Sequence, residues 1–210
     1  MGSERMDNPG DARTTLSLFE TEASRSDPVK TYPIFGQPRG GTTAVAGCVQ
    51  RLGVFLGEPL HRNLEDRGFA RPRGPGPEVV RERNAQREVW GWKFPNAANY
   101  IDSLHVALRN PRFVVVTRDL AANAIGISAR DTSYDAHRAL EVGLQQMQRN
   151  LSLIARLRHP TLVISYEKLV LKPEPVIRDI ADFLCVGSTE EMIRDAVNFV
   201  RPGSYQDVTG

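Results

Sequence analysis

Residues 36–43, "GQPRGGTT", have the composition of an anion-binding loop. Three glycines let the backbone turn tightly and approach a ligand closely. A helical pattern begins near Thr42, and the free N–H groups and the dipole of a helix N-terminus favour a bound anion. An ATP-binding loop of the type G-x-x-x-x-G-K-[ST] has lysine where Thr42 stands, and the cation here is Arg39. The loop therefore predicts a phosphate or sulfate site that does not suit a triphosphate, with a ligand-free glycine-rich turn as the alternative.

Three further polar side chains directly follow strand-like runs. Lys93 follows "WGW", Arg118 follows "VVVT", and Tyr166 follows "TLVIS". In open α/β sheets, ligands bind where strands end and helices begin, so these side chains and the loop are expected at one edge. Taken alone, Arg118 is better explained as a surface salt-bridge partner, and Lys93 is explained as well by a solvated lysine at a strand end. Together with the loop, they predict a positively charged pocket.

Short apolar runs alternate with helical patterns along the chain. Strands are expected at residues 32–35, 88–92, 112–117 and 161–165, and helices at 42–52, 96–108, 119–129, 134–157, 174–184 and 189–199. The run "FVVV" does not alternate, which is typical of a parallel strand covered on both faces. The order predicts an α/β, three-layer P-loop-type fold, with a central parallel sheet of about four to five strands flanked by helices.

Two segments interrupt this order. Residues 70–78, "ARPRGPGPE", are expected to form a mobile Pro/Gly loop. The long helix from Tyr134 is expected to pack one face on the core. That face contains Ala139, Val142, Leu144, Met147, Leu151, Ile154 and Leu157.

The length of 210 residues suits one well-buried domain. We expect that domain at residues 31–201, a disordered N-terminal tail at 1–30, and a C-terminal tail at 202–210. The 27 basic residues nearly balance 25 acidic ones, which argues against a nucleic-acid surface. Two cysteines are too few for a disulfide framework, and no apolar run is long enough to span a bilayer. A cytoplasmic protein without a transmembrane segment is expected.

Three stretches together resemble the sulfotransferases that use 3′-phosphoadenosine-5′-phosphosulfate (PAPS). "GQPRGGTT" is similar to their 5′-phosphosulfate loop, "VVVTRDLAANAIGISAR" to their 3′-phosphate strand and helix, and "SYEKLVLKPEPVIRDIADFLCV" to their Y-E-x-L-x-x-x-P…F-L segment. The resemblance covers about residues 32–200. It implies in-line transfer of a sulfuryl group from PAPS, a co-substrate, to an acceptor hydroxyl or amine, with no metal ion.

The resemblance also assigns roles to single residues. Arg39 would stabilise the charge that develops on the leaving oxygen, and Arg118 would bind the 3′-phosphate with its guanidinium fork. Lys93 matches a lysine near the transferred group, and Tyr166 matches a tyrosine that contacts the adenine. The rest of the loop would hold the 5′-phosphate: Pro38, Gly40, Gly41, Thr42 and Thr43.

The chain departs from the family pattern on the 3′-phosphate side. The family's serine eight positions after the arginine is Gly126 here, and Ser128 comes two residues later. Two residues turn a helix by about 200°, so Ser128 would face away unless the helix is distorted. Arg130 lies one turn beyond Gly126 and is our candidate for the missing contact. The family's adenine-stacking tryptophan is missing, since Ala44 stands at its position. The segment "FVRPGSY" with Arg201 faintly resembles a family element that closes over the 3′-phosphate.

The general base is not marked by a motif. Relatives with a histidine two residues after the lysine have Pro95 at that position here. Other relatives use a carboxylate after the first helix, where "GEPLHRNLEDRGF" offers Glu58, His61, Glu65 and Asp66. A base must reach the acceptor proton and have a suitable pKa. Asp66 and Glu65 are the chosen candidates, and a solvated charged loop is the alternative.

The acceptor is left open between a carbohydrate, a lipid-linked glycan and a small hydroxylated molecule, and homodimerisation is left open too. Five arginines before Trp90 favour an anionic acceptor: Arg71, Arg73, Arg81, Arg83 and Arg87. Two other functions stay in consideration. One is a P-loop kinase-like phosphotransferase, which Thr42 disfavours, and the other is a non-catalytic nucleotide-binding protein of the same fold.

Overall fold

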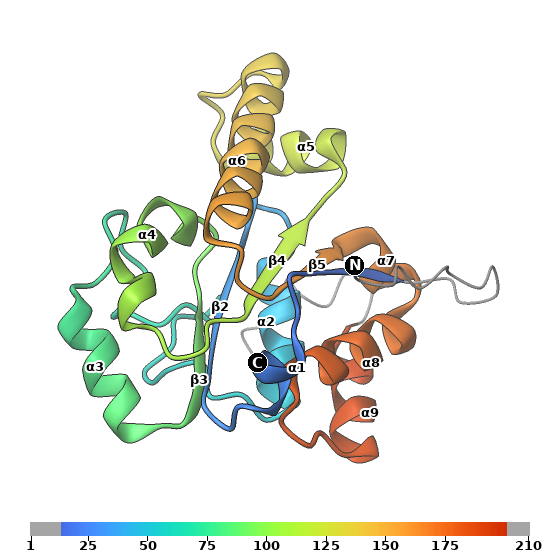
Figure 1. Ribbon diagram of the computed structural model, residues 1–210. Coiled ribbons are helices and arrows are strands. Elements are labelled where there is room, and N and C mark those ends of the chain that lie inside the picture. The colour runs from blue at the N-terminus through green and yellow to red at the C-terminus, as the bar shows by residue number, and fades with distance from the viewer. Residues whose placement is uncertain (1–13, 201–210) are drawn as a thin grey trace, which may run out of the picture.

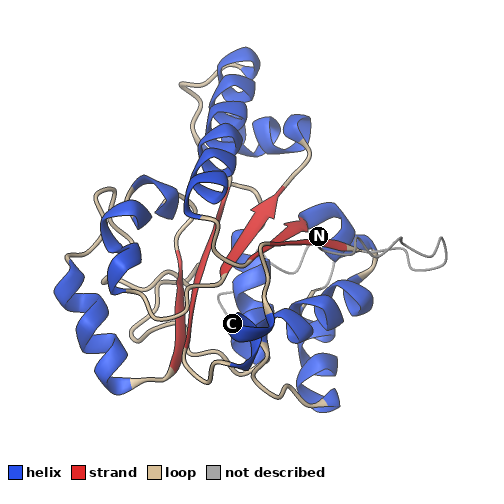
Figure 2. Cartoon of the chain, viewed as in Figure 1, coloured by secondary structure: helices blue, strands red, loops and turns tan. Residues whose placement is uncertain are grey.

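The computed structural model describes residues 14–200, which form a five-stranded sheet between two layers of helices (Figures 1 and 2). The strand order is β1-β5-β4-β2-β3. The strands are β1 (Thr15–Leu18), β2 (Lys30–Gly36), β3 (Val89–Lys93), β4 (Phe113–Thr117) and β5 (Thr161–Ser165). Strands β2 to β5 are parallel, and only β1 runs antiparallel, beside β5. The α/β fold predicted from the sequence is confirmed, with a mixed rather than a purely parallel sheet.

Helices cover both faces of this sheet. They are α1 (Glu22–Ser26), α2 (Thr42–Arg51), α3 (Pro77–Gln86), α4 (Ile101–Leu104), α5 (Leu120–Arg130), α6 (Ala136–Leu157), α7 (Tyr166–Leu171), α8 (Pro173–Leu184) and α9 (Glu190–Phe199), with short 3₁₀ turns at Ala97–Asn99 and His105–Ala107. One core cluster joins Ile34, Val114 and Ile164 to α2, α8 and α9. The other joins Phe35 and Val115 to α3, α4 and the C-terminal part of α6. Burial on both faces explains why the strands show no alternation.

The expected disordered tail at residues 1–30 is wrong for its described part, residues 14–30. Strand β1 and helix α1 lie there, and the remainder of the tail lies outside the described residues. Strand β1 is a four-residue edge strand whose middle residues, Leu16 and Ser17, are exposed. A strand so short and so exposed has no hydrophobic pattern to detect, because its pairing with β5 and not its own side chains makes it a strand.

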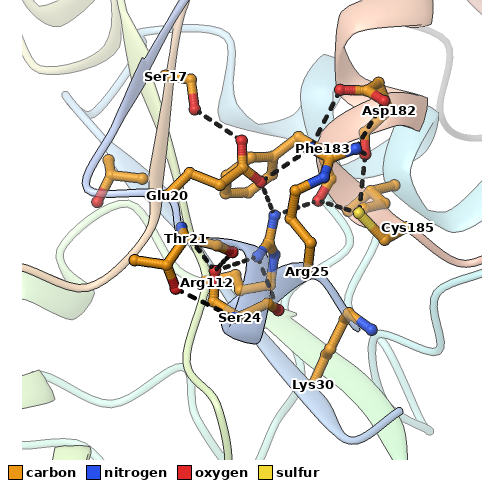
Figure 3. Close-up of polar contacts among 12 residues, drawn as sticks. Ser17, Glu20, Thr21, Ser24, Arg25, Lys30, Arg112, Asp182, Phe183 and Cys185 are labelled. Carbon is orange, nitrogen blue, oxygen red and sulfur yellow. Dashed lines mark hydrogen bonds and ion pairs between the residues drawn. The ribbon is translucent and has the colours of Figure 1, made fainter. Parts of the chain in front are cut away.

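Arg112 connects this N-terminal segment to helix α8 (Figure 3). Its fully buried guanidinium donates to the carbonyl oxygens of Ser24 at 3.0 Å and Phe183 at 2.7 Å, pairs with Glu20, and lies over the Phe183 ring. Arg25 continues the network to Asp182 at 2.8 Å. A buried cation requires acceptors of this kind, because an unpaired charge in the interior is strongly destabilising.

Three local expectations are also corrected. The Pro/Gly segment ends in a helix, because Pro77 occupies the first turn of α3, where a missing N–H costs nothing. The helix expected at 96–108 is broken into α4 and two 3₁₀ turns. Helix α6 buries Gln146 and Asn150, whereas Leu144 and Leu151 are 55% and 52% exposed. The predicted face of α6 is therefore confirmed in part, since Ala139 and Ile154 are buried, and wrong for Leu144 and Leu151.

Helices α5 and α6 pack against each other as a hairpin that projects beyond the sheet at the top of Figure 1. Ala139 of α6 is packed against Ala124 and Ile127 of α5. The base of this hairpin lies beside the loop that follows β2, because Gly143 of α6 and Gln37 are hydrogen-bonded. No helix within residues 14–200 has the length and apolar character needed to cross a membrane.

Candidate active site

The carboxyl ends of β2, β3, β4 and β5 border a cleft of about 710 Å³. Ten of the residues selected from the sequence line it: Pro38, Arg39, Gly41, Thr42, Thr43, Glu65, Lys93, Arg118, Arg130 and Tyr166. Gly40, Asp66 and Ser128 do not line it, and Arg201 lies outside the described residues. The parallel order of the strands brings these side chains together, because parallel strands end at one edge of the sheet.

The loop after β2 approaches helix α2 in a conformation that needs glycine. Gly41 is the N-cap of α2 and has φ of 89°, in the left-handed region. A Cβ at Gly41 would lie 2.1 Å from Cδ2 of Tyr166, so the Tyr166 ring packs directly on the loop backbone. The first N–H groups of α2 have no acceptor within the helix. They and the Thr42 and Thr43 side chains can therefore receive an anion.

Carbonyl oxygens of the loop are held by donors that come from outside it. Asn123 Nδ2 donates to the Pro38 carbonyl at 2.7 Å, and Arg118 Nη1 donates to the Arg39 carbonyl at 2.7 Å. The Gly40 amide donates to the Gln37 carbonyl at 2.9 Å, so this amide is not free to bind an anion, contrary to the role predicted for Gly40. The Pro38 and Arg39 carbonyl groups thus point toward hydrogen-bond donors. This direction lowers the repulsion between these carbonyl groups and an anion bound by the loop.

Arg118 is positioned by several contacts at once. Its backbone N–H donates to Gln37 Oε1 at 3.1 Å, its guanidinium carbon lies 5.1 Å from the Tyr166 ring centre, and Glu167 lies 4.0 Å from its Nε. The side chain is only 20% exposed. Arg118 borders the cleft, where a guanidinium group can bind an anion. Tyr166 serves packing as well, since it is 7% exposed between Gly41 and Arg118.

Lys93 and Glu65 form an ion pair at the bottom of the cleft. Lys93 Nζ lies 2.9 Å from Glu65 Oε1 and donates to the Asn63 carbonyl at 3.0 Å. The Lys93 side chain is 2% exposed and the Glu65 side chain 15% exposed. Burial lowers the pKa of Lys93 from its ordinary value, and the neighbouring Glu65 carboxylate opposes that shift. A carboxylate and an ammonium group thus lie together where a proton can be accepted and negative charge stabilised.

Asp66, the other predicted base, is directed away from the cleft. Its carboxylate pairs with Arg83 at 2.9 Å and accepts a hydrogen bond from the Gly68 amide at 2.7 Å. The side chain is 4% exposed. Asp66 therefore stabilises the loop that carries Glu65 and lies outside the reach of a substrate in the cleft.

Gly126, at the position of the family serine, packs closely against Arg39. A Cβ at Gly126 would lie 3.2 Å from the Cβ of Arg39 and 3.6 Å from Arg118 Nη1. Ser128 does not reach the cleft, and its Oγ is buried with no hydrogen-bond partner among the described residues. Arg130 does border the cleft. Helix α5 thus brings Arg130, one turn after Gly126, to the cleft.

Sequence reasoning did not select several residues that the fold brings here. His61 was weighed only as one of four possible bases, and Arg62 and Asn63 line the cleft beside it. The signal for His61 was its place in the same segment as Glu65. The buried Gln37 and Asn123 carry no such signal, because their importance depends on contacts across the fold. Within residues 14–200, no three His, Cys, Asp or Glu side chains are grouped so that they could hold a metal ion.

Comparison with known proteins gives the family of this chain. Residues 69–190, more than half of the chain, match the family model described as "Sulfotransferase family". The chain therefore belongs to the sulfotransferase family. The matched stretch contains Lys93, Arg118 and Tyr166, and it begins after the loop at residues 36–43.

A solved structure has the same fold. The sulfotransferase domain from the olefin synthase of Synechococcus PCC 7002 superposes with a TM-score of 0.56 at 17% sequence identity. The alignment covers 87% of this chain and 80% of that domain. A search of curated proteins gives no significant match to the chain.

The contact between Gly41 and Tyr166 leads to a stability prediction. Gly41→Ala adds a Cβ against the ring at a left-handed position, whereas Gly187→Ala is a matched control with φ of 73° and no atom within 4 Å of the added Cβ. We expect the control to lose about 1 kcal/mol of unfolding free energy from backbone strain alone. Gly41→Ala should lose about 1–3 kcal/mol more from overpacking. Urea unfolding measures both, and equal losses would show that the ring does not constrain the loop.

Proposed function

We propose that this sulfotransferase uses PAPS as its sulfuryl donor and transfers the group by in-line displacement to an acceptor hydroxyl. The observation that carries the proposal is that one cleft unites an anion-binding loop, two further arginines and a buried lysine–carboxylate pair. A donor with a phosphosulfate at one end and a phosphate at the other needs two separate cationic sites. The loop around Arg39 and the pair Arg118 and Arg130 are the candidates for these two sites.

In this proposal the 5′-phosphosulfate binds the α2 N-terminus, Thr42, Thr43 and Arg39. The 3′-phosphate binds Arg118 and Arg130, and the adenine lies near Tyr166. Ala44, in place of an aromatic side chain, leaves that wall of the cleft without a stacking partner. The Arg118 guanidinium lies over the Tyr166 ring. This contact fixes the orientation of the ring that the adenine would meet.

The chemical step needs a base and a stabilised leaving group. Glu65 accepts the proton of the acceptor hydroxyl, and the oxygen forms a bond to sulfur. The bond between sulfur and the bridging oxygen breaks, and its electron pair stays on the 5′-phosphate, which yields adenosine 3′,5′-bisphosphate. Arg39 and Lys93, which both line the cleft, stabilise that developing charge in this proposal. Displacement of Glu65 from Lys93 by the arriving acceptor would free both groups for these roles.

Nucleotide binding separates the proposal from its two alternatives. We expect adenosine 3′,5′-bisphosphate to raise the midpoint of thermal unfolding without magnesium, because a ligand at 100 times its Kd stabilises by about 2.7 kcal/mol. A shift with ATP and magnesium, and none with the bisphosphate, would instead support a kinase-like phosphotransferase. Bisphosphate binding with no sulfate transferred from labelled PAPS to any acceptor in a hydroxyl-rich pool would support a non-catalytic protein.

Arg130 is predicted to replace the family serine in binding the 3′-phosphate. Arg130→Ala should raise the Kd of adenosine 3′,5′-bisphosphate about tenfold, because a charge-assisted hydrogen bond is lost. Ser128→Ala is the control and should change it by less than about twofold. Adenosine 5′-phosphate lacks the group concerned and should bind both variants as it binds the wild type. Unchanged bisphosphate binding by Arg130→Ala would assign the contact elsewhere.

Glu65 is predicted to be the general base, in preference to its neighbour Asp66. Glu65→Gln should lower kcat for sulfate transfer by about 10²–10⁴-fold, the usual contribution of acid–base catalysis. Asp66→Asn should lower stability through its partner Arg83 and leave kcat within about tenfold of wild type. His61→Ala tests the other titratable side chain of the cleft. If that variant is inactive and Glu65→Gln is active, the proton goes to His61.

A further inference from the structure

Two buried amide side chains form hydrogen bonds in and around the loop at residues 36–43, which we call the donor loop, but do not line the cleft. Gln37 is 1% exposed and Asn123 is 0% exposed. Gln37 Oε1 accepts from the Arg118 amide at 3.1 Å, and its Nε2 donates to the Gly143 carbonyl of α6 at 3.1 Å. Asn123 of α5 donates to the Pro38 carbonyl at 2.7 Å. These bonds connect the loop, the end of β4 and the α5–α6 hairpin.

Stability alone gives a poor account of this arrangement. The Oδ1 of Asn123 is buried without a hydrogen-bond partner among the described residues, and an unsatisfied buried acceptor costs about 1–3 kcal/mol. Helix α6 also approaches so closely that a Cβ at Gly143 would lie 2.6 Å from that oxygen. An apolar side chain of similar size would avoid the unpaired acceptor but could not donate to the Pro38 carbonyl. What the amide of Asn123 provides is therefore its contact with the loop.

We infer that Gln37 and Asn123 are positioning residues of the donor site, which orient the loop and Arg118 from the α5–α6 hairpin. Asn123 holds the Pro38 carbonyl and thereby turns the following backbone toward the 5′ end of the donor. Gln37 affects the binding of both ends of the nucleotide. It belongs to the loop at the 5′ end, and it also fixes the backbone of Arg118, the residue assigned to the 3′-phosphate. This inference rests on the proposed function and names side chains that touch no substrate.

The hairpin itself supplies matched controls. Gln146 and Asn150 of α6 are a second buried amide pair, 6% and 3% exposed, in which Gln146 Nε2 donates to Asn150 Oδ1 at 3.2 Å; within residues 14–200 neither side chain is hydrogen-bonded to the loop. Gln146→Met and Asn150→Leu therefore remove buried amide hydrogen bonds from the same hairpin without touching the donor site. Gln37→Met and Asn123→Leu are the corresponding test variants.

The experiment measures the Kd of adenosine 3′,5′-bisphosphate by calorimetry and the unfolding free energy by urea for all four variants. We expect Gln37→Met and Asn123→Leu to raise Kd about tenfold or more, the effect of about 1.4 kcal/mol, and the two controls to change it less than about twofold. Asn123→Leu should leave the Kd of adenosine 3′-phosphate unchanged, because that ligand lacks the 5′ group. Gln37→Met should raise the Kd of both ligands.

Two results would overturn the inference: test variants that bind within twofold of wild type, or control variants that weaken binding as much as the test variants. Gln37→Asn keeps the amide but is one methylene too short to span both contacts, so it replaces Gln37→Met if that variant does not fold. Failure of the wild type to bind the bisphosphate is a different outcome, which rejects the proposed donor and the inference with it.

Discussion

The site depends on how one short stretch of backbone directs its polar groups. An anion site made largely of main-chain N–H groups works only if the neighbouring carbonyl oxygens are directed elsewhere, since each carbonyl repels the ligand. Between Gln37 and Gly41 this is achieved by donors from distant segments, with Asn123 on the Pro38 carbonyl and Arg118 on the Arg39 carbonyl. The Tyr166 ring closes the loop from the other side at Gly41. The geometry of the loop is thus set by the elements around it.

Charge is treated differently in the two parts of the cleft. Lys93 is buried and compensated by Glu65, whereas Arg130 and Arg39 are exposed on the cleft wall. A buried, paired lysine keeps a defined position, because an uncompensated charge in the interior is costly. Exposed arginines retain their hydration until a ligand replaces it. This difference agrees with the proposal that the inner part of the cleft performs chemistry and the outer part binds phosphate groups.

Elements with a strong local pattern were predictable, and elements held only by partners were not. The strand "FVVVT" is buried on both faces, so its run of apolar residues was a sufficient signal. Strand β1 is a strand only because β5 lies beside it and Arg112 fastens the following segment. Helix α6 was predictable only in part, because it buries Ala139 and Ile154 as expected but turns Gln146 and Asn150 inward and leaves Leu144 and Leu151 exposed. Side-chain polarity gave the periodicity of α6 but not all the residues of its buried face.

By itself the sequence determined the glycine-rich loop and the residues that follow the parallel strands, because each of these is a local pattern of glycines, a helix start or a strand end. Only the tertiary structure decided which of the adjacent carboxylates Glu65 and Asp66 faces the cleft. Glu65 meets Lys93, 28 residues away along the chain, and Asp66 meets Arg83, 17 residues away. Adjacent residues in an irregular segment have no fixed facing direction, so their long-range ion-pair partners set it.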